Sequence, residues 1–359
     1  PRDPPPPPPR DETPKTAAIP VLTREFAVSL APTPSSSAIQ AAMASNPLTI
    51  PIVMDPLDSI TPYKDSSLAM LLEAGRRGAE IHYFEQKDLS LVSGEALGQS
   101  TLLQVRDDND DWYTFGDRRA VALGDLDAIL MRKDPPFDME YIYTTYVLDR
   151  AQEAGALVVN APQALRDMNE KAYTAWFPDF VPPTLITRSM EKMKAFLVEH
   201  ERVVAKPLDG MGGRSIFALR KGDKNANVIF ETLTNYGTEF AVTQVFVPEI
   251  KDGDKRILLI EGEPVPHALA RVPTGDDHRG NMVAGAVTRG QDLSKRDLEI
   301  CEAVGPVLRD AGVLFAGIDV IGDYLTEVNV TSPTGIRELD KQFDLNIAGL
   351  MFDAIEAKL

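Results

Sequence analysis

The chain has few of the residues that hold small secreted domains or zinc sites together. It contains one cysteine, Cys301, among 359 residues. A single cysteine excludes an internal disulfide and a cysteine-rich zinc site, and it is typical of proteins kept in a reducing compartment. The histidines are scattered without the spacing of metal ligands: they are His82, His200, His267 and His278. We therefore expect a cytoplasmic protein.

Basic charge and long apolar runs are also scarce. The 37 lysines and arginines stand against 54 aspartates and glutamates, for a formal net charge of -17. Nucleic acids and anionic membranes bind basic surfaces, so neither is expected as a partner. No apolar run approaches the roughly 20 residues that a membrane-spanning helix needs. An anion can still bind in a locally basic pocket.

Residues 1–46 differ in composition from the rest of the chain. They are rich in proline, with an unbroken run at 4–9, and they include a serine run at 35–37. Such a segment cannot bury enough apolar surface to offset the entropy lost on ordering. It has no cationic start followed by an apolar core, so it does not resemble a secretory signal. We expect a disordered, proline-rich leader that is dispensable for chemistry.

Helix and strand patterns alternate from residue 47 to about residue 167. Asp65 and the two serines after it supply capping side chains for the first helix. The alternation indicates a mostly parallel α/β sheet, hence an N-terminal α/β domain over 47–167. The expected strands are 49–54, 80–84, 128–131 and 157–159, and the expected helices are 68–77 and 141–155.

The remainder, 168–359, is expected to be an α+β domain. Its strands pair as hairpins, separated by helices, and no internal repeat is evident. The expected strands are 202–206, 215–219, 240–246, 255–260 and 264–271, and the expected helices are 191–200, 225–233 and 297–311.

A glycine-rich loop follows the strand that ends at Lys206. Its glycines, Gly210, Gly212 and Gly213, would let backbone amides approach phosphate oxygens closely, and the lysine adds a positive charge. No helix opens directly after the loop, so it is neither a Walker A loop nor a dinucleotide fingerprint. The pattern indicates a phosphate site; an ordinary hairpin with a flexible turn is the alternative.

A second hairpin is expected at 315–330, where two apolar runs flank Gly322 and Asp323. Glu327 and Asn329 are two residues apart, so they leave the same face of their strand. Counting back through the turn places Asp319 almost opposite Glu327. Three hard oxygen ligands suit Mg²⁺, which takes its remaining ligands from water and phosphates. The alternative is a half-buried strand pair with solvated acids at its edge.

Several stretches in the same order resemble the ATP-grasp superfamily, and specifically the bacterial type of glutathione synthetase. The resemblance covers about 48–359. The stretches are 53–56, 64–67, 131–138, 165–171, 206–213 (Lys-Pro-Leu-Asp-Gly-Met-Gly-Gly), 251–256 and 327–334 (Glu-Val-Asn-Val-Thr-Ser-Pro-Thr).

The resemblance implies a pre-ATP-grasp α/β domain followed by a two-lobed α+β ATP-grasp domain. The lobes would be a central lid lobe, 168–248, and a C-terminal lobe, 249–359, with a mobile loop at 272–290. After Gly285 the family usually continues with glycine, arginine, glycine and an acid, whereas this chain has Ala-Val-Thr-Arg-Gly at 286–290. The arginine expected near Val287 is displaced to Arg289. We expect this departure to affect loop closure, and so turnover, more than the type of reaction.

The resemblance also implies roles for single residues. The ATP-binding set is Lys171, Lys206, Gly210, Met211, Gly212, Gly213, Gln244, Val245, Phe246, Val247 and Asp254. The Mg²⁺ ligands would be Asp319, Glu327 and Asn329; the substrate-binding residues Arg132, Ser332 and Thr334; and the catalytic arginines Arg256, Arg271 and Arg279.

Each role has a simpler alternative. Lys171 could be a surface lysine at the start of a helix, and Arg132 part of a solvated charge cluster, although ligands of α/β sheets gather at the carboxyl ends of strands. Arg256 and Arg271, on facing strands of one hairpin, could serve in salt bridges.

The implied reaction joins γ-glutamylcysteine to glycine, with ATP converted to ADP and phosphate through an acyl phosphate. Two Mg²⁺ ions are expected, with Mn²⁺ as a possible substitute, and relatives imply a homo-oligomer. Two alternatives stay open. One is another ATP-grasp carboxylate–amine ligase with a different acid or amine. The other is an ATP-binding regulatory module without catalysis, suggested by the altered loop.

Overall fold

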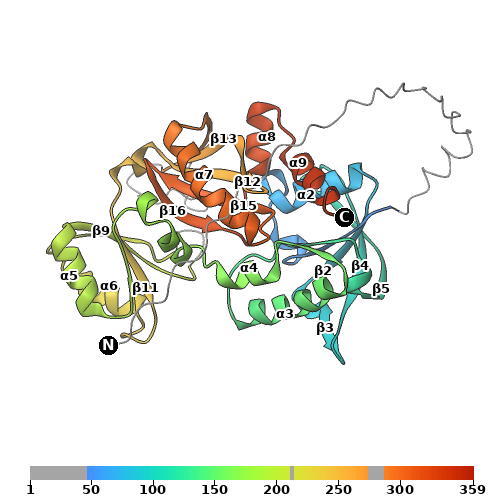
Figure 1. The fold of residues 1–359 in the computed structure, drawn as a ribbon, viewed down its shortest axis with the longest axis horizontal. Coiled ribbons are helices and arrows are strands. Elements are labelled where there is room, and N and C mark those ends of the chain that lie inside the picture. Colours follow the sequence, from blue (N-terminus) through green and yellow to red (C-terminus); the bar gives the residue numbers. More distant parts are fainter. Residues whose placement is uncertain (1–46, 211–213, 274–286) are drawn as a thin grey trace, which may run out of the picture. The chain divides into compact units, whose positions relative to one another are not determined.

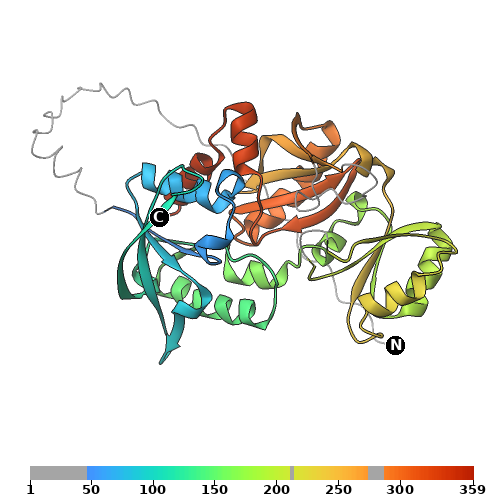
Figure 2. The ribbon, with the colours of Figure 1, turned by 180° about the vertical axis from the view of Figure 1, so that it is seen from behind.

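The computed structural model describes residues 47–210, 214–273 and 287–359, which belong to one compact unit, Pro47–Leu359. The expected leader, 1–46, lies outside the described residues, so its predicted disorder stays a prediction. The described strands form three sheets, which Figures 1 and 2 show from opposite sides. No helix in the described part of the chain is both long and apolar enough to cross a membrane.

The first sheet has the strand order β3-β4-β2-β1-β6-β7, with β5 added beside β4. Its parallel part confirms the predicted strands: β1 (Thr49–Val53), β2 (Glu80–Phe84), β6 (Ala128–Met131) and β7 (Leu157–Val159). The sheet also has an antiparallel extension that the sequence pattern did not predict, made of β3 (Leu89–Val92), β4 (Glu95–Val105) and β5 (Tyr113–Ala122). β5 is largely exposed, so its sequence lacks the apolar alternation of a half-buried strand.

Two of the three α-helices of this region begin at capping carboxylates. Asp65 accepts a hydrogen bond from Leu68 N at 2.8 Å, and Asp138 accepts one from Tyr141 N at 2.9 Å. The cap expected at Asp65 is therefore confirmed. The helices are α2 (Ser66–Arg76), α3 (Met139–Ala154) and α4 (Pro162–Asp167). Short 3₁₀ turns connect the elements: η1 (Leu57–Ser59), η2 (Pro62–Lys64), η3 (Gln86–Asp88), η4 (Leu123–Asp125), η5 (Ala172–Trp176), η6 (Pro178–Phe180) and η7 (Pro248–Asp252).

The second sheet is antiparallel, in the order β10-β9-β11-β8, and two helices cover one of its faces (Figure 1). Its strands are β8 (Thr184–Thr187), β9 (Arg202–Pro207), β10 (Phe217–Arg220) and β11 (Ala241–Val245). Its helices are α5 (Met190–His200) and α6 (Ala226–Leu233). The predicted pairing across the glycine-rich loop is confirmed, with Ala205 opposite Phe217.

The third sheet is also antiparallel, in the order β14-β13-β12-β15-β16. Both predicted hairpins are present. The strands are β12 (Asp254–Ile260), β13 (Glu263–Val272), β14 (Val287–Asp292), β15 (Phe315–Ile321) and β16 (Tyr324–Asn329). The helices are α7 (Lys295–Asp310), α8 (Ile336–Phe343) and α9 (Ile347–Glu356).

Apolar packing joins the first and third sheets but separates the second. Two clusters of buried side chains each include residues of both the first and the third sheet, such as Val53 with Ile318 in one and Ile52 with Phe315 in the other. A third cluster, which includes Val203 and Phe230, draws only on the second sheet and its helices. The second sheet therefore has a core of its own, and the described contact between its Lys206 and Glu327 of the hairpin β15–β16 is polar.

Charged side chains connect the C-terminal end of α2 to α9. Arg77 bonds to Glu73 and also to Gly349 O and Asp353 Oδ1, at 2.9 and 2.7 Å. The hydrogen bond from Arg76, helped by the one from Arg77, lowers the pKa of Glu73 to about 2, against the opposing effect of burial. Through Arg77, the ionised Glu73 therefore connects α2, the first α-helix of the described residues, to α9, the last.

We predict a pH dependence of stability from this carboxylate. Because its pKa is lower in the folded state, it stabilises the fold above the unfolded-state pKa of about 4.5, and this contribution is lost as the pH falls through 4.5 toward 2. Urea unfolding of the wild type and of Glu73→Gln between pH 6 and 3 measures it. The free energy of unfolding of the wild type should exceed that of the variant at pH 6, and this difference should shrink as the pH falls. A difference that stays constant with pH would contradict the prediction.

Candidate active site

The hairpin β15–β16 brings two acidic side chains together. It turns through Gly322 and Asp323, with Gly322 at a φ of +57° that glycine adopts without steric cost. Asp319 lies directly opposite Glu327, and Asn329 lies opposite Gly317. The predicted facing of Asp319 and Glu327 is therefore confirmed, while their metal-binding role stays a prediction.

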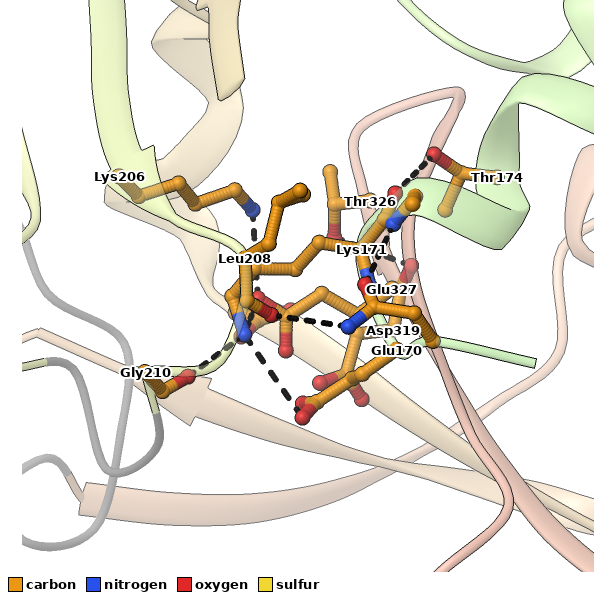
Figure 3. Close-up of polar contacts among 12 residues, drawn as sticks. Glu170, Lys171, Thr174, Lys206, Leu208, Gly210, Asp319, Thr326 and Glu327 are labelled. Atoms are coloured by element: carbon orange, nitrogen blue, oxygen red, sulfur yellow. Dashed lines mark hydrogen bonds and ion pairs between the residues drawn. The ribbon is translucent and has the colours of Figure 1, made fainter. Parts of the chain in front are cut away.

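Two buried lysines from distant parts of the chain converge on Glu327 (Figure 3). Lys206 is near the end of β9, and its Nζ lies 3.2 Å from Glu327 Oε1. Lys171 is just before η5, and its Nζ lies 3.6 Å from the same oxygen. Burial would raise the pKa of Glu327, but Lys171 and Lys206 outweigh it and hold the pKa well below its usual range. Lys171 is 4 % exposed, which argues against an ordinary surface lysine.

The segment before η5 is bonded to the start of the glycine-rich loop. Lys171 Nζ donates to Gly210 O at 2.7 Å, and Asn169 Nδ2 donates to Leu208 O at 3.2 Å. Asn169 Oδ1 also accepts from the backbone amides of Lys171 and Ala172, at 3.1 and 2.9 Å. Asn169 was not among the predicted site residues. An asparagine just before a helical turn is a capping signature that could have identified it.

We predict that Asn169→Asp weakens nucleotide binding. Aspartate keeps the acceptor for the two backbone amides but replaces the donor to Leu208 O with an oxygen. The start of the loop then keeps only the hydrogen bond from Lys171 to Gly210 O. KM for ATP should rise about 10-fold, equal to about 1.4 kcal/mol, with little change in KM for the acid substrate. Asn109→Asp, a change at an exposed position of the β4–β5 connection, is the matched control. Equal rises in both KM values would contradict the prediction.

Two buried arginines pair with the hairpin's carboxylate Asp319. Arg256 donates through Nε to Asp319 Oδ1 and through Nη2 to Oδ2, the second at 2.8 Å. Arg271 Nη2 lies 2.7 Å from Asp319 Oδ2 and 2.5 Å from Asp254 Oδ2. The salt-bridge alternative for these arginines thus describes the contacts seen here. Both guanidinium groups lie on the face of the third sheet that carries Glu327, the side chain that Lys206 contacts, so a substrate role remains proposed for them.

Two further acids near the lysines, Glu170 and Asp254, have raised pKa values. Burial, the main cause, raises the pKa of Glu170 to about 8 and that of Asp254 to about 7, and Glu327 adds to both shifts by repulsion. Asp254 Oδ1 is buried without a hydrogen-bond partner among the described residues. Such a set of hard oxygens suits a divalent cation.

The described side chains do not form a closed metal cage. No group of three acidic, histidine or cysteine side chains converges on a single point within 47–210, 214–273 and 287–359. Asp319 is turned toward its two arginines, and Asn329 Oδ1 accepts from Thr331 N and Oγ1, both at 3.2 Å. The donor set fits Mg²⁺ as a partial set of ligands, with the rest supplied by phosphates and water.

Arg132 joins the first sheet to the loop after β16. It follows β6, is 6 % exposed, and donates through Nε to Ser67 Oγ at 3.0 Å and through Nη2 to Pro333 O at 2.9 Å. Ser332 is buried beside it, with its hydroxyl 3.5 Å from Arg132 O, and Thr334 is partly buried in the same loop. Arg132 is therefore not part of a solvated charge cluster.

The remaining predicted residues lie in or around β11 and the loop. Gln244 is buried in β11 and donates to Thr184 Oγ1 at 2.9 Å. Val245 ends that strand, and Phe246 and Val247 are buried just before η7. Met211, Gly212, Gly213 and Arg279 lie outside the described residues, as does most of the loop predicted at 272–290.

The displaced arginine of that loop does not take over the expected position. In β14, Thr288 lies opposite Arg271, whereas Arg289 lies opposite Ala270. Residues opposite one another share a face of the sheet, so Arg289 points away from the face that carries Arg271. It is exposed and contacts Gln291. On the face of the sheet that carries Arg271, the residue of β14 beside it is therefore Thr288 and not an arginine.

Comparisons with known proteins agree over most of the described unit. The model of the prokaryotic glutathione synthetase N-terminal domain matches 48–166, and that of the prokaryotic glutathione synthetase ATP-grasp domain matches 170–344. The chain is 54 % identical to glutathione synthetases of Vibrio parahaemolyticus and Escherichia coli O127:H6, over 308 residues that cover 86 % of this chain and 98 % of each relative. The solved ATP-grasp ligase PsnB superposes with a TM-score of 0.57 at 20 % identity, covering 86 % of this chain and 98 % of that one, which supports the fold alone. The chain therefore belongs to the prokaryotic glutathione synthetase family and has the ATP-grasp fold.

Proposed function

We propose that this protein is an ATP-dependent ligase that joins γ-glutamylcysteine to glycine. The observation that carries the proposal is the convergence of Lys171 and Lys206 on Glu327, at 3.6 and 3.2 Å. Two buried cations beside a cluster of acids can bind a triphosphate together with its metal ion. The relatives are named glutathione synthetases, which gives the product, and γ-glutamylcysteine and glycine are its two parts.

The nucleotide would lie between the second and third sheets. Lys171 and Lys206 would neutralise oxygens of the α- and β-phosphates, and backbone amides of the glycine-rich loop would bind the remaining phosphate oxygens. The segment Gln244, Val245, Phe246 and Val247 would contact the adenine, with Asp254 close to the nucleotide. These lysines are already desolvated and held by Glu327 and Gly210 O, so little reorganisation accompanies phosphate binding.

Asp319, Glu327 and Asn329 would hold two Mg²⁺ ions, for which Mn²⁺ can substitute. When bound, the ions would supply positive charge to the β- and γ-phosphates. Arg256 and Arg271, which contact Asp319 in this structure, would lie beside the acyl group of the substrate.

In the proposed reaction the cysteinyl carboxylate of the peptide attacks the γ-phosphorus of ATP, which forms the acyl phosphate and releases ADP. The amine of glycine then attacks the acyl carbon, phosphate leaves from the tetrahedral intermediate, and the amine loses a proton. Arg256, Arg271 and Arg279 would stabilise the charge on the acyl phosphate. Arg132, Ser332 and Thr334 would bind the carboxylates of the peptide.

The proposal also covers the organisation of the protein. The separate core of the second sheet supports the lobe limits 168–248 and 249–359. The domain limits 47–167 and 168–359 are proposed from the sequence pattern and the resemblance. A cytoplasmic location agrees with the buried thiol of Cys301. A homo-oligomer is proposed from the resemblance to bacterial relatives.

An assay of ADP release tests the function, with γ-glutamylcysteine and glycine added separately and together. Release that requires both substrates would support the proposal. Release with a different acid or amine, but not with this pair, would favour another carboxylate–amine ligase. ATP binding without release under any pairing would favour a regulatory module, which the altered loop first suggested.

A further inference from the structure

The register of the metal-site hairpin depends on one extra residue. Ile321 pairs with Tyr324 and Val320 with Leu325, as expected for a two-residue turn. If that register continued, Asp319 would face Thr326. The pairing shifts instead between Val320 and Asp319, so that Asp319 faces Glu327 and Thr326 is left as the bulged residue of β16.

The bulge decides which face of the sheet carries Glu327 and Asn329. Without it, Glu327 would lie opposite Ile318, because a shift of one residue moves every later side chain to the other face. Ile318 and Val320 belong to the apolar core that the first and third sheets share. An unbulged β16 would therefore direct Glu327 and Asn329 into that core and away from Lys171 and Lys206.

The buried hydroxyl group of Thr326 makes a hydrogen bond across the bulge. Thr326 Oγ1 donates to the backbone carbonyl of Asp319 at 3.1 Å, and the side chain is 6 % exposed (Figure 3). The bond joins the bulged residue to the backbone of one predicted metal ligand, and the other ligand, Glu327, is the next residue in the chain. A valine side chain has the same shape but cannot make this bond.

We propose that Thr326 is a positioning residue, whose hydroxyl holds the bulge that places Asp319 and Glu327 on one face for a divalent cation. The inference rests on the proposed metal role of these two side chains. It assigns Thr326 no contact with ATP, metal or substrate. Loss of the hydroxyl should weaken cation binding first and catalysis as a consequence.

The test compares Thr326→Val with Thr326→Ser by titrating Mn²⁺ into the full-length protein with saturating ADP, followed by electron paramagnetic resonance. Valine should weaken Mn²⁺ binding at least 10-fold, and serine should stay within about 3-fold of the wild type. KM for γ-glutamylcysteine should change little in both. Thr243→Val is the matched control, because Thr243 is a buried β-strand threonine whose hydroxyl has no partner within the described residues.

Wild-type Mn²⁺ affinity in Thr326→Val would overturn the proposal, as would equal losses in Thr326→Val and Thr326→Ser. If the valine variant does not fold, Thr326→Cys replaces it, since a thiol is a weak donor of similar size. The proposed function can fail independently: a wild type that binds Mn²⁺ and ADP tightly but does not ligate γ-glutamylcysteine to glycine would refute the ligase assignment and leave the role of Thr326 standing.

Discussion

Glu327→Gln is expected to abolish ligation while leaving the protein folded. The substitution keeps the shape of the side chain but removes the charge that faces Lys171 and Lys206 at 3.6 and 3.2 Å. It also removes a predicted metal ligand. Loss of one preorganised charged group in an active site typically lowers kcat by about 10²–10³-fold, and loss of a metal ligand adds to this. We expect a fall in kcat of at least about 10³-fold.

Single-turnover formation of ADP from ATP and γ-glutamylcysteine, without glycine, measures the step directly. The matched control is Glu302→Gln, because Glu302 is an exposed glutamate of α7. The circular dichroism of Glu327→Gln should match the wild type, because Glu327 contributes to no apolar cluster. Its melting temperature should fall, because the buried Lys171 and Lys206 lose a charged partner. Acyl-phosphate formation at the wild-type rate would exclude Glu327 from the metal site.

The sequence predicts the fold well where strands are buried on both faces. β2, β6 and β7 have the predicted limits because short, mostly apolar runs bounded by polar residues leave little choice. β5 was missed because most of its side chains are exposed and its composition resembles a loop. β8 and β14 were missed for a related reason, since their pattern contains few fully buried positions.

The site is less accessible to sequence reasoning because its contacts join distant segments. Lys206 and Glu327 are 121 residues apart, and no spacing rule brings them to 3.2 Å. Their proximity was inferred from the chemistry of a triphosphate and then from the resemblance. The facing of Asp319 and Glu327 was predicted by counting through the turn, yet the count is correct only because of the bulge at Thr326. Bulges depend on tertiary packing and leave no reliable mark in one sequence.

Asn160 is a second residue that sequence reasoning overlooked, and it joins the first sheet to the third. It follows β7, is 3 % exposed, and uses all of its amide group. Nδ2 donates to Phe315 O and Val330 O at 2.7 and 2.6 Å, while Oδ1 accepts from the amides of Leu314 and Phe315, both at 2.9 Å. These four hydrogen bonds connect Asn160 to the start of β15 and to the residue after β16. They therefore fix both ends of the hairpin that carries Asp319 and Glu327.

Asn160→Ala should therefore be the most destabilising single change proposed for the apolar junction between the sheets. It leaves two backbone carbonyls and two amides buried without their partners, and each unsatisfied group costs about 1–3 kcal/mol. With partial relaxation we expect a loss of about 3–5 kcal/mol in the free energy of unfolding, measured by urea denaturation. Asn160→Asp should be no better, because it directs a carboxylate oxygen at Phe315 O and Val330 O. Asn109→Ala, at an exposed position, should change stability by less than about 0.5 kcal/mol. If Asn160→Ala unfolded at the wild-type urea concentration, the four bonds would contribute nothing net, and apolar packing alone would hold the two sheets together.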